Sequence, residues 1–487
     1  MNRRDFLKMV AAAGATSAAG SILAGSEVPL LKLGVLSDIH LRCFPHREDY
    51  FRKALLWFRD KGADAVVIAG DIADSGRVAE LKLCADTWFS VFPDDKAPDG
   101  RRVERLFVFG NHCVDAWRWA ANNPHYRFPI SNEAQRLADS IGYADVRQRA
   151  WRELFHEDFA PIWMKTVNGI PIVGAHWEKR GDGIAIEEFM KVHGKTIDPT
   201  LPFFYIQHEH PKDTCFGSWA WGHDDGRSTR ALSRFPKAVA FSGHSHYSLT
   251  DERTVWQGAF TSINTASLFD VSLDFSLREN ASGNRFGYKG EKRPHRMPAL
   301  AKGDVRQGQF VTVYCDKLVV ERHDFKYDLP LGCNWEVPLP AAAGGPFSYA
   351  SRRARRTAPA FGPNAKVEVR ERNDPKGEVF YDVTFPRADS RNGCRVFEYE
   401  VTATLVADEV DLVQAQRRVL APDFHLPECE KLMRGGACTF SSEDLQLSGE
   451  YRFSVRPVEC FGLKGGAIES SPFTISAKGA MQSAQKG

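Results

Sequence analysis

The sequence predicts an α/β domain whose sheet is covered by helices, followed by a small all-β sandwich. Apolar runs in the first half are continuous, helix-like stretches separate several of them, and residues 366–475 read as short strands without helical periodicity. Strands that are apolar throughout are buried on both faces, which is typical of sheets with helical cover. A chain of 487 residues exceeds what one core organises, so two or three domains are expected.

Each apolar run of the first half ends abruptly at a polar residue. The runs occupy residues 31–37, 65–69, 106–109, 171–174, 203–207 and 238–242. Between them, residues 47–61 and 132–156 have helical character. Because the loops at the carboxyl ends of such strands converge on one edge of the sheet, the polar residues that follow the strands are expected to lie in one place.

The pattern changes after residue 251. Short β-prone pieces at 308–314 and 317–321 are expected to complete the sheet system. Residues 341–363 are rich in Ala, Gly, Pro and Arg, and this composition predicts a linker.

The charge balance gives no sign of a nucleic-acid partner. The chain has 64 basic and 62 acidic residues, a formal charge of +2, so no long-range attraction to nucleic acid or anionic membrane is implied. Four arginines at 352–356 are interpreted as a solvated loop, because interleaved aromatic residues are missing. No transmembrane span is expected beyond the N-terminal segment.

The last domain is predicted to be a β-sandwich at residues 364–478, with a tail at 479–487. Segments 396–401 and 451–458 alternate apolar and polar residues, as strands with one buried face do. A Leu-led turn before the Tyr-x-Phe-x-Val strand at 447–455 resembles a fibronectin type III domain. The expected partners of this domain are the first domain, the cell envelope or carbohydrate.

The N-terminal segment contains Arg3 and Arg4, followed by an Ala/Gly/Ser-rich apolar stretch to about Gly25. Residues 1–27 resemble a twin-arginine export signal, which implies a periplasmic or extracellular protein of a bacterium that folds before export. An amphipathic helix or a short membrane anchor is the alternative.

The ten cysteines are scattered and form no CxxC pair, so a structural zinc site has no support. Cys429 and Cys438, nine positions apart, are the best candidates for a disulfide.

The residues at the strand ends are of the types that bind metals or carry protons. They are Asp38, His40, Asp71, Asn111, His112, His208, His244 and His246. Imidazole and carboxylate ligands without thiolate suit manganese, iron or zinc better than calcium. Two such ions about 3.5–4 Å apart can share a hydroxide and clamp a phosphoryl oxygen.

Five motifs in order carry a family resemblance. They are Asp38-x-His40, Gly70-Asp71-Ile72-Ala73-Asp74, Gly110-Asn111-His112, a later strand-end His and Gly243-His244-Ser245-His246. Together they resemble the signature of the calcineurin-like metallophosphoesterase superfamily, over about residues 31–322. The resemblance implies a four-layer α/β/β/α sandwich at residues 28–340 and two divalent or trivalent ions.

The resemblance also implies a role for each residue. Asp38, His40 and His246 would hold one ion, Asn111, His208 and His244 the other, and Asp71 would bridge them. His112 would lie near the phosphate and protonate or stabilise the leaving alkoxide, an effect of typically about 10²–10⁴ in rate.

The sequence departs from the family pattern at two places. Gln207-His208-Glu209-His210-Pro211 offers two histidines where the family has His-x-Pro, and His208 is preferred because it follows the strand directly. Cys113 replaces the Asp that commonly supports the catalytic histidine, so His112 is expected to be oriented differently. Cys113 itself is read as a packed thiol, with a reactive one as the alternative.

Two further features flank these motifs. His176 ends the strand at 171–174 and is predicted to support the ligands or face the substrate. The segment 214–233, which contains Trp219 and Trp221, is either part of the substrate wall or a packed surface loop.

These features predict an exported metal-dependent phosphoesterase that attacks phosphate esters with a metal-bridging hydroxide. Among the motif loops only Arg42 and the more distant Arg77 offer a cation for a monoester dianion, which favours phosphodiesters. A phosphomonoesterase is the alternative. A non-catalytic adhesion protein on the same scaffold is a third possibility, which the complete ligand set disfavours.

Overall fold

The computed structural model describes residues 28–42, 48–120, 139–177, 184–217, 220, 222–271, 305–389, 395–407, 410–432 and 434–476. The expected export signal, Cys43, Trp219 and Trp221 lie outside these residues. None of the helices within the described part of the chain is long and apolar enough to span a bilayer.

The first sheet has the strand order β12-β11-β10-β1-β2-β3, with β13 paired to β11. Its strands are β1 (Leu31–Leu36), β2 (Ala65–Ala69), β3 (Glu104–Val108), β10 (Gln307–Val313), β11 (Lys317–Asp324), β12 (Leu329–Pro330) and β13 (Trp335–Pro338). The strands β1, β2 and β3 are parallel, whereas β10 runs antiparallel to β1. The strand pieces expected after residue 251 therefore complete this sheet.

The second sheet has the order β4-β5-β6-β7-β9-β8. Its strands are β4 (Ile162–Val167), β5 (Ile170–Ala175), β6 (Phe203–Ile206), β7 (Ala238–Ser242), β8 (Val255–Gln257) and β9 (Thr261–Asn264). Four consecutive strands, β5, β6, β7 and β9, are parallel. Both sheets thus turn the carboxyl ends of parallel strands toward loops that can form one site.

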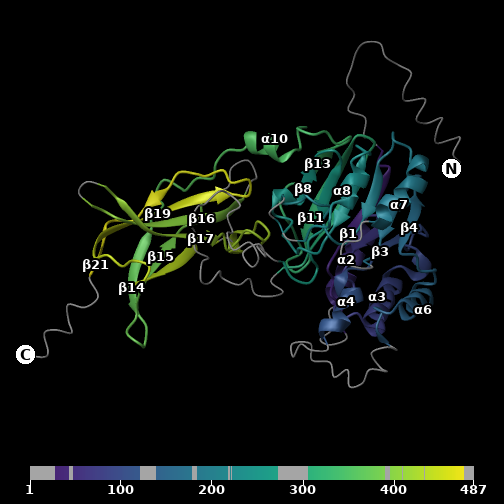
Figure 1. Ribbon diagram of the computed structural model, residues 1–487, viewed down its shortest axis with the longest axis horizontal. Coiled ribbons are helices and arrows are strands. Elements are labelled where there is room, and N and C mark those ends of the chain that lie inside the picture. Colours follow the sequence, from purple (N-terminus) through teal and green to yellow (C-terminus); the bar gives the residue numbers. More distant parts are fainter. Residues whose placement is uncertain are drawn as a thin grey trace, which may run out of the picture.

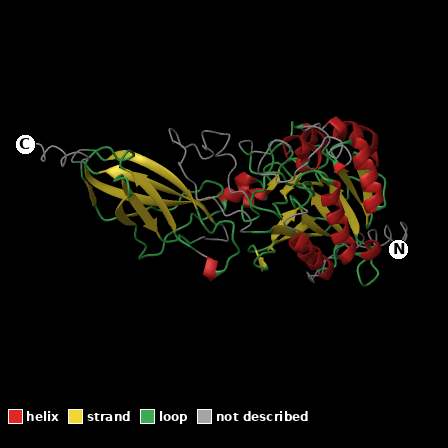
Figure 2. Ribbon diagram, turned by 90° about the horizontal axis from the view of Figure 1, so that it is seen from below, coloured by secondary structure: helices red, strands yellow, loops and turns green. Residues whose placement is uncertain are grey.

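The two sheets pack face to face and are covered by helices on their outer faces (Figures 1 and 2). The inter-sheet core includes Leu33 and Val35 of β1 and Phe204 of β6, whose ring stacks on Phe241 with centroids 5.7 Å apart. Helices α2 (Glu48–Asp60), α3 (Val78–Val91) and α6 (Ala144–Phe155) cover the first sheet. Helices α7 (Ile184–His193) and α8 (Arg227–Leu232) cover the second.

The continuous apolar runs follow from this layering. Successive side chains of a strand point to opposite faces, and here one face meets the other sheet while its reverse meets helices, so every position of β2 and β7 is buried. Helix α6 begins at Ala144, within the predicted helical stretch 132–156, whose residues up to 138 lie outside the described part.

The C-terminal region contains two further antiparallel sheets, ordered β14-β15-β18 and β17-β16-β19-β20, with β21 paired to β19. The strands are β14 (Glu368–Asn373), β15 (Val379–Phe385), β16 (Val396–Leu405), β17 (Leu412–Leu420), β18 (Gly436–Ser441), β19 (Gly449–Glu459), β20 (Ile468–Glu469) and β21 (Phe473–Ile475). One apolar cluster, including Tyr399 and Phe453, fills the space between them. The prediction of an α/β fold followed by all-β sheets is confirmed.

The segment predicted as a linker contains the short helix α10 (Tyr349–Ala354), which lies above the junction of the two regions in Figure 1. Arg352 of α10 is buried and donates to the carbonyl oxygens of Glu252 and Val255. The reading of the arginine cluster as a wholly solvated loop is therefore wrong for Arg352, because backbone carbonyls satisfy its guanidinium within the protein.

The disulfide prediction is also wrong: Cys429 and Cys438 are free thiols.

Candidate metal centre

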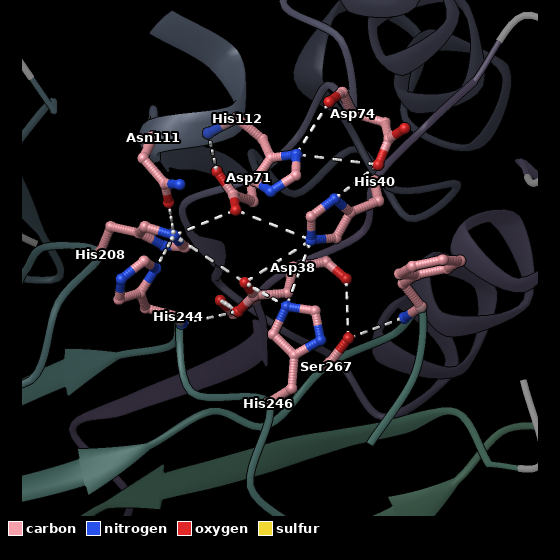
Figure 3. Close-up of polar contacts among 12 residues, drawn as sticks. Asp38, His40, Asp71, Asp74, Asn111, His112, His208, His244, His246 and Ser267 are labelled. Carbon is pink, nitrogen blue, oxygen red and sulfur yellow. Dashed lines mark hydrogen bonds and ion pairs between the residues drawn. The ribbon is translucent and has the colours of Figure 1, made fainter. Parts of the chain in front are cut away.

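The strand-end residues converge on one cluster, drawn in Figure 3. Asp38 and His40 follow β1, Asp71 follows β2, and Asn111 and His112 begin helix α4 (Asn111–Ala120) after β3. From the second sheet, His208 follows β6, and His244 and His246 follow β7. All eight predicted residues therefore meet where the two sheets present their carboxyl ends.

One side of the cluster is formed by Asp38, His40 and His246. Their candidate ligand atoms lie within 4.8 Å of one another. His246 Nε2 lies 3.0 Å from Asp38 Oδ1 and 3.2 Å from His40 Nε2. Asp38 and His40 are buried, so bulk water does not separate these groups.

The other side is formed by Asp71, His208 and His244, whose ligand atoms meet the same 4.8 Å limit. His208 Nε2 lies 3.2 Å from Asp71 Oδ2, 3.1 Å from His244 Nδ1 and 3.0 Å from Asn111 Oδ1. Asp71 Oδ2 also lies 3.7 Å from His40 Nε2 on the first side. Asp71 thus stands between the two halves, where the family resemblance places a bridging ligand.

Residues outside the cluster fix the orientation of three imidazoles. His40 Nδ1 donates to Asp74 Oδ1 at 2.9 Å, His208 Nδ1 to the Ala69 carbonyl at 2.9 Å, and His246 Nδ1 to Asp270 Oδ1 at 2.6 Å. With the outer nitrogen donating, the Nε2 lone pair of each neutral ring faces the cluster. This is the tautomer that a metal ligand requires.

The backbone of the cluster adopts an uncommon conformation. Asp38, His40, Asp71, His244 and His246 all have positive φ, between 47° and 67°. Positive φ is uncommon for residues with a side chain and often marks functional sites, where the surrounding fold holds the strain.

Gly70, directly before Asp71, allows the imidazole of His208 to lie close to the backbone. Gly70 has φ +100°, and a Cβ there would lie 2.0 Å from His208 Nδ1. No side chain larger than hydrogen fits at this position, because it would displace the imidazole.

His112 lies at the rim of the cluster. Its backbone N–H donates to Asp71 Oδ1 at 2.8 Å, and its Nδ1 donates to the Asp74 carbonyl at 2.9 Å. Its side chain is 23% exposed, compared with 3% for His40. Asp74 therefore orients the ring in the absence of the Asp that Cys113 replaces.

Cys113 is fully buried and accepts a hydrogen bond from the Ala73 N–H at 3.4 Å. Burial and the charge of Asp71 raise the pKa of its thiol, so the reactive thiolate is disfavoured. The interpretation of Cys113 as a packed thiol fits this environment.

The structure separates the two histidines of the fifth motif. Both ring nitrogens of His210 are hydrogen-bonded to hydroxyls, at 2.8 Å from Ser242 Oγ and 2.8 Å from Ser245 Oγ. His210 has no nitrogen left for an ion, which favours His208 as the ligand.

His176 does not fit the prediction that it faces substrate. Its Nδ1 accepts from the Phe109 N–H at 3.0 Å, and its ring packs against Phe109, Trp151 and Phe159. Burial and the charge of Arg147 hold its pKa well below the usual range. The residue ends its strand at the predicted edge, but its side chain turns into an aromatic core and holds the loop before Asn111.

The buried carboxylates of the cluster need positive charge beside them. Although burial opposes protonation of His40, the nearby carboxylates of Asp38 and Asp74 raise its pKa to about 9. Burial likewise disfavours ionised Asp71, yet the charges of His208 and His112 hold its pKa far below the usual value. Without an ion, protons on histidines must balance these carboxylates.

The cluster fits a metal better than protons. Asp38 Oδ1 is buried and has no hydrogen bond of acceptable geometry among the described residues. Burial and the charge of His208 also lower the pKa of His244 to about 3, so that ring stays neutral beside the carboxylates. A divalent ion would bind the lone pairs of the paired imidazoles, whose facing ring nitrogens lie 3.1–3.2 Å apart.

Sequence reasoning missed several residues around the cluster. Asp74 and Asp270 hold the outer nitrogens of His40 and His246. Trp177 lies with its ring centroid 6.2 Å from that of His208 and 5.9 Å from that of His244. Asp74 belongs to the motif Gly70-Asp71-Ile72-Ala73-Asp74, but no pattern in the sequence marks Asp270 or Trp177.

Comparison with known proteins agrees with this geometry. Residues 31–248 match the family of calcineurin-like phosphoesterases. No curated protein matches the chain.

Among solved structures, a predicted phosphoesterase from Streptococcus pneumoniae is 12% identical with a TM-score of 0.26, covering 63% of this chain and 97% of that one. Vps29 from Entamoeba histolytica, complexed with zinc, is 9% identical with a TM-score of 0.27, covering 63% and 99%. An archaeal phosphodiesterase is 10% identical with a TM-score of 0.24, covering 63% and 100%. Similarity at this level is too distant to assign a role to any residue.

Proposed function

We propose that the chain works with two ions and prefers phosphodiesters. Residues 31–248 form a calcineurin-like metallophosphoesterase domain, and the chain is a metal-dependent hydrolase of phosphoric esters. The proposed ligands are Asp38, His40, Asp71, Asn111, His208, His244 and His246.

The observation that carries the proposal is the orientation of the histidines. Three imidazoles donate from Nδ1 to a fixed acceptor, so that their Nε2 lone pairs converge on Asp38 and Asp71 from two different sheets. Without an ion these Nε2 atoms carry protons, and a bound ion would take the place of those protons.

Bound ions would supply Lewis acidity, both toward the phosphoryl oxygens and toward a water molecule. The protein's own contribution to the leaving group is His112. Its Nδ1 is held by the Asp74 carbonyl, so its Nε2 is the nitrogen available to give a proton to the departing oxygen. Giving a proton from Nε2 requires the imidazolium form of His112; burial disfavours this form and lowers the pKa of His112, whereas the charge of Asp71 favours it.

The preference for diesters is supported by how nearby cations are engaged. Arg42 Nε donates to the Asp74 carboxylate, and Arg77 Nη2 lies 3.7 Å from Asp139. Both guanidiniums therefore face protein carboxylates, whereas a monoester dianion favours extra cationic donors.

Aromatic rings on both sides of the cluster suit a bulky ester. Trp177 stands beside His208 and His244, and Phe269 has its centroid 5.1 Å from that of His40. Trp177 is fixed by a hydrogen bond from Nε1 to Asp115 Oδ2 at 2.8 Å. Such rings can pack against the organic groups of a diester.

Metal content and turnover test the proposal. The purified full chain is expected to contain about two ions per molecule and to hydrolyse bis-nitrophenyl phosphate. Asp71→Asn should lose most of its turnover and at least one ion. His193→Asn, at the end of α7 outside the cluster, is the matched control and should keep both. Full turnover in Asp71→Asn would refute the ligand set.

A comparison of mono- and bis-nitrophenyl phosphate tests the ester preference. A higher kcat/KM for the diester supports the proposal, and a higher value for the monoester assigns a phosphomonoesterase. If neither is hydrolysed by the metal-loaded chain, the adhesion alternative takes over.

We also propose export through the twin-arginine-type N-terminus and a fibronectin type III-like C-terminal domain. The second is supported by Tyr451, whose hydroxyl donates to the Leu447 carbonyl at 2.8 Å, as in the tyrosine corner of such sandwiches. Replacing Arg3 and Arg4 by Lys should leave the protein in the cytoplasm of an expressing cell. Unchanged periplasmic activity would contradict the export proposal.

A further inference from the structure

A cavity of about 450 Å³ lies at the junction between the α/β domain and the C-terminal sheets. We call it the junction cavity. It is lined by five arginines: Arg322, Arg352, Arg355, Arg356 and Arg395. No residue of the candidate metal centre lines it, so it is separate from the site described above.

The charge of the junction cavity is unbalanced. Five guanidinium groups face three carboxylates, those of Glu252, Glu336 and Glu428, which leaves an excess of two positive charges. Glu252 forms an ion pair with Arg356, and Glu336 lies 3.5 Å from Lys317, which does not line the cavity. Two of the three carboxylates are therefore paired with cations other than Arg322 and Arg395.

Arg322 of β11 is a buried cation held in place by neutral groups. Nη1 donates to the Leu249 carbonyl at 2.8 Å, Nη2 donates to the Cys333 carbonyl at 2.6 Å, and the guanidinium lies 3.7 Å from the ring centroid of Trp335. Its Nε has no acceptor among the described residues. Burial and the charge of Arg395 lower its pKa to about 9.

Arg395 approaches from the C-terminal domain. Its Nη1 donates to the Phe424 carbonyl at 3.1 Å and to that of Leu426, while Nη2 has no acceptor in the described part of the chain. The nearest carboxylate, Glu428, lies 3.8 Å from Nε, and its side chain is 52% exposed. Two buried guanidiniums from different domains thus line the same cavity, and the carboxylates of Glu428 and Asp423 offset only part of their charge.

Uncompensated buried charge is costly unless a ligand of opposite charge completes the site. Planar guanidiniums bind phosphate oxygens in pairs, and these two are already fixed by backbone carbonyls, so little order is lost on binding. We propose that the junction cavity binds an oxyanion of the phosphate class between Arg322 and Arg395 and thereby links the two domains. This inference does not depend on the proposed metal centre.

The test is calorimetric titration of the metal-loaded full chain with inorganic phosphate at constant ionic strength. The Asp71→Asn variant separates this site from phosphate bound at the metal centre, and the junction site is expected to survive in it. Arg355→Gln removes an exposed rim charge and should weaken phosphate binding about fivefold, and Arg395→Gln more than tenfold. Turnover of the ester substrate should stay unchanged in Arg355→Gln.

Arg353→Gln is the matched control, because Arg353 lies in α10, two residues before Arg355, and has an exposed side chain but does not line the cavity. Its phosphate affinity should stay within about twofold of the parent chain. Glu428→Gln, an exposed change that removes a competing carboxylate, should tighten binding about threefold. A saturating concentration of phosphate should also raise the melting temperature, and the increase should be larger for the variants that bind phosphate more tightly.

Two results would overturn the proposal: loss of all phosphate binding in Asp71→Asn, or equal weakening by Arg353→Gln and Arg355→Gln. A parallel titration with methylphosphonate identifies the source of the anion. Binding as tight as that of phosphate assigns a phosphoryl group on an organic carrier, and binding of phosphate alone assigns the inorganic ion.

Discussion

Removal of the Asp74 carboxylate tests how strongly the outer residues control the metal centre. Asp74 Oδ1 accepts from His40 Nδ1 at 2.9 Å, and both side chains are almost fully buried, so solvent screens this contact little. A hydrogen bond to a charged group contributes about 1.5–3 kcal/mol, against about 1 kcal/mol for a neutral pair. Asp74→Asn, which can still accept from His40, should therefore cost about 0.5–2 kcal/mol, or roughly two- to thirtyfold in metal affinity.

Asp74→Ala should cost more, because it leaves the buried His40 N–H without an acceptor. About a hundredfold loss is expected, the upper end of the effects known for residues that orient metal ligands. Affinity is measured by competition of the metal-loaded chain with a chelator of known strength. Asp86→Asn, which removes an equal charge from an exposed ion pair on α3, serves as the control. If Asp74→Ala binds metal within twofold of the parent, Asp74 does not hold His40 in the orientation that binds metal.

Three further predictions follow from the same structure. His112→Asn should retain its metal and lower kcat about 10²–10⁴-fold for alkyl phosphodiesters, yet much less for nitrophenyl esters whose leaving group needs no proton; equal losses for both would exclude an acid role. Burial raises the pKa of Glu80 from 4.5 to about 7, so folding takes up a proton and stability falls as pH rises through that window; urea unfolding should show at most about 3 kcal/mol of this loss, absent in Glu80→Gln. Tyr451→Phe should lower the unfolding free energy by about 1–2 kcal/mol without changing turnover, and an unchanged melting curve would argue against a structural hydrogen bond to Leu447.

The sequence predicts the positions of the strands and their convergence well. The run at 31–37 matches β1 and that at 238–242 matches β7, because buried parallel strands carry continuous apolar side chains that stop where the chain reaches the polar edge. The meeting of Asp38 with His246, 208 residues apart, needs only the rule that the carboxyl ends of such strands share an edge.

Side-chain direction is what the sequence does not reveal. His176 stands at the predicted strand end, yet its ring packs among aromatic residues. Asp270 reaches His246 across 24 residues of chain, from a loop without periodicity. Arg352 sits in a segment with the composition of a linker, but its guanidinium finds carbonyl acceptors inside the protein. Each outcome depends on long-range packing, which local patterns do not encode.

The metal centre draws its residues from both sheets, and this joins ion binding to the cohesion of the whole α/β domain. If ions bind there, they link the two sheets, because Asp38 and Asp71 come from one sheet and His208 and His246 from the other. Binding free energy then becomes folding free energy. The relation is reciprocal. A cavity made in the inter-sheet core, at Phe204 for example, would lower the affinity for the ions without changing a ligand.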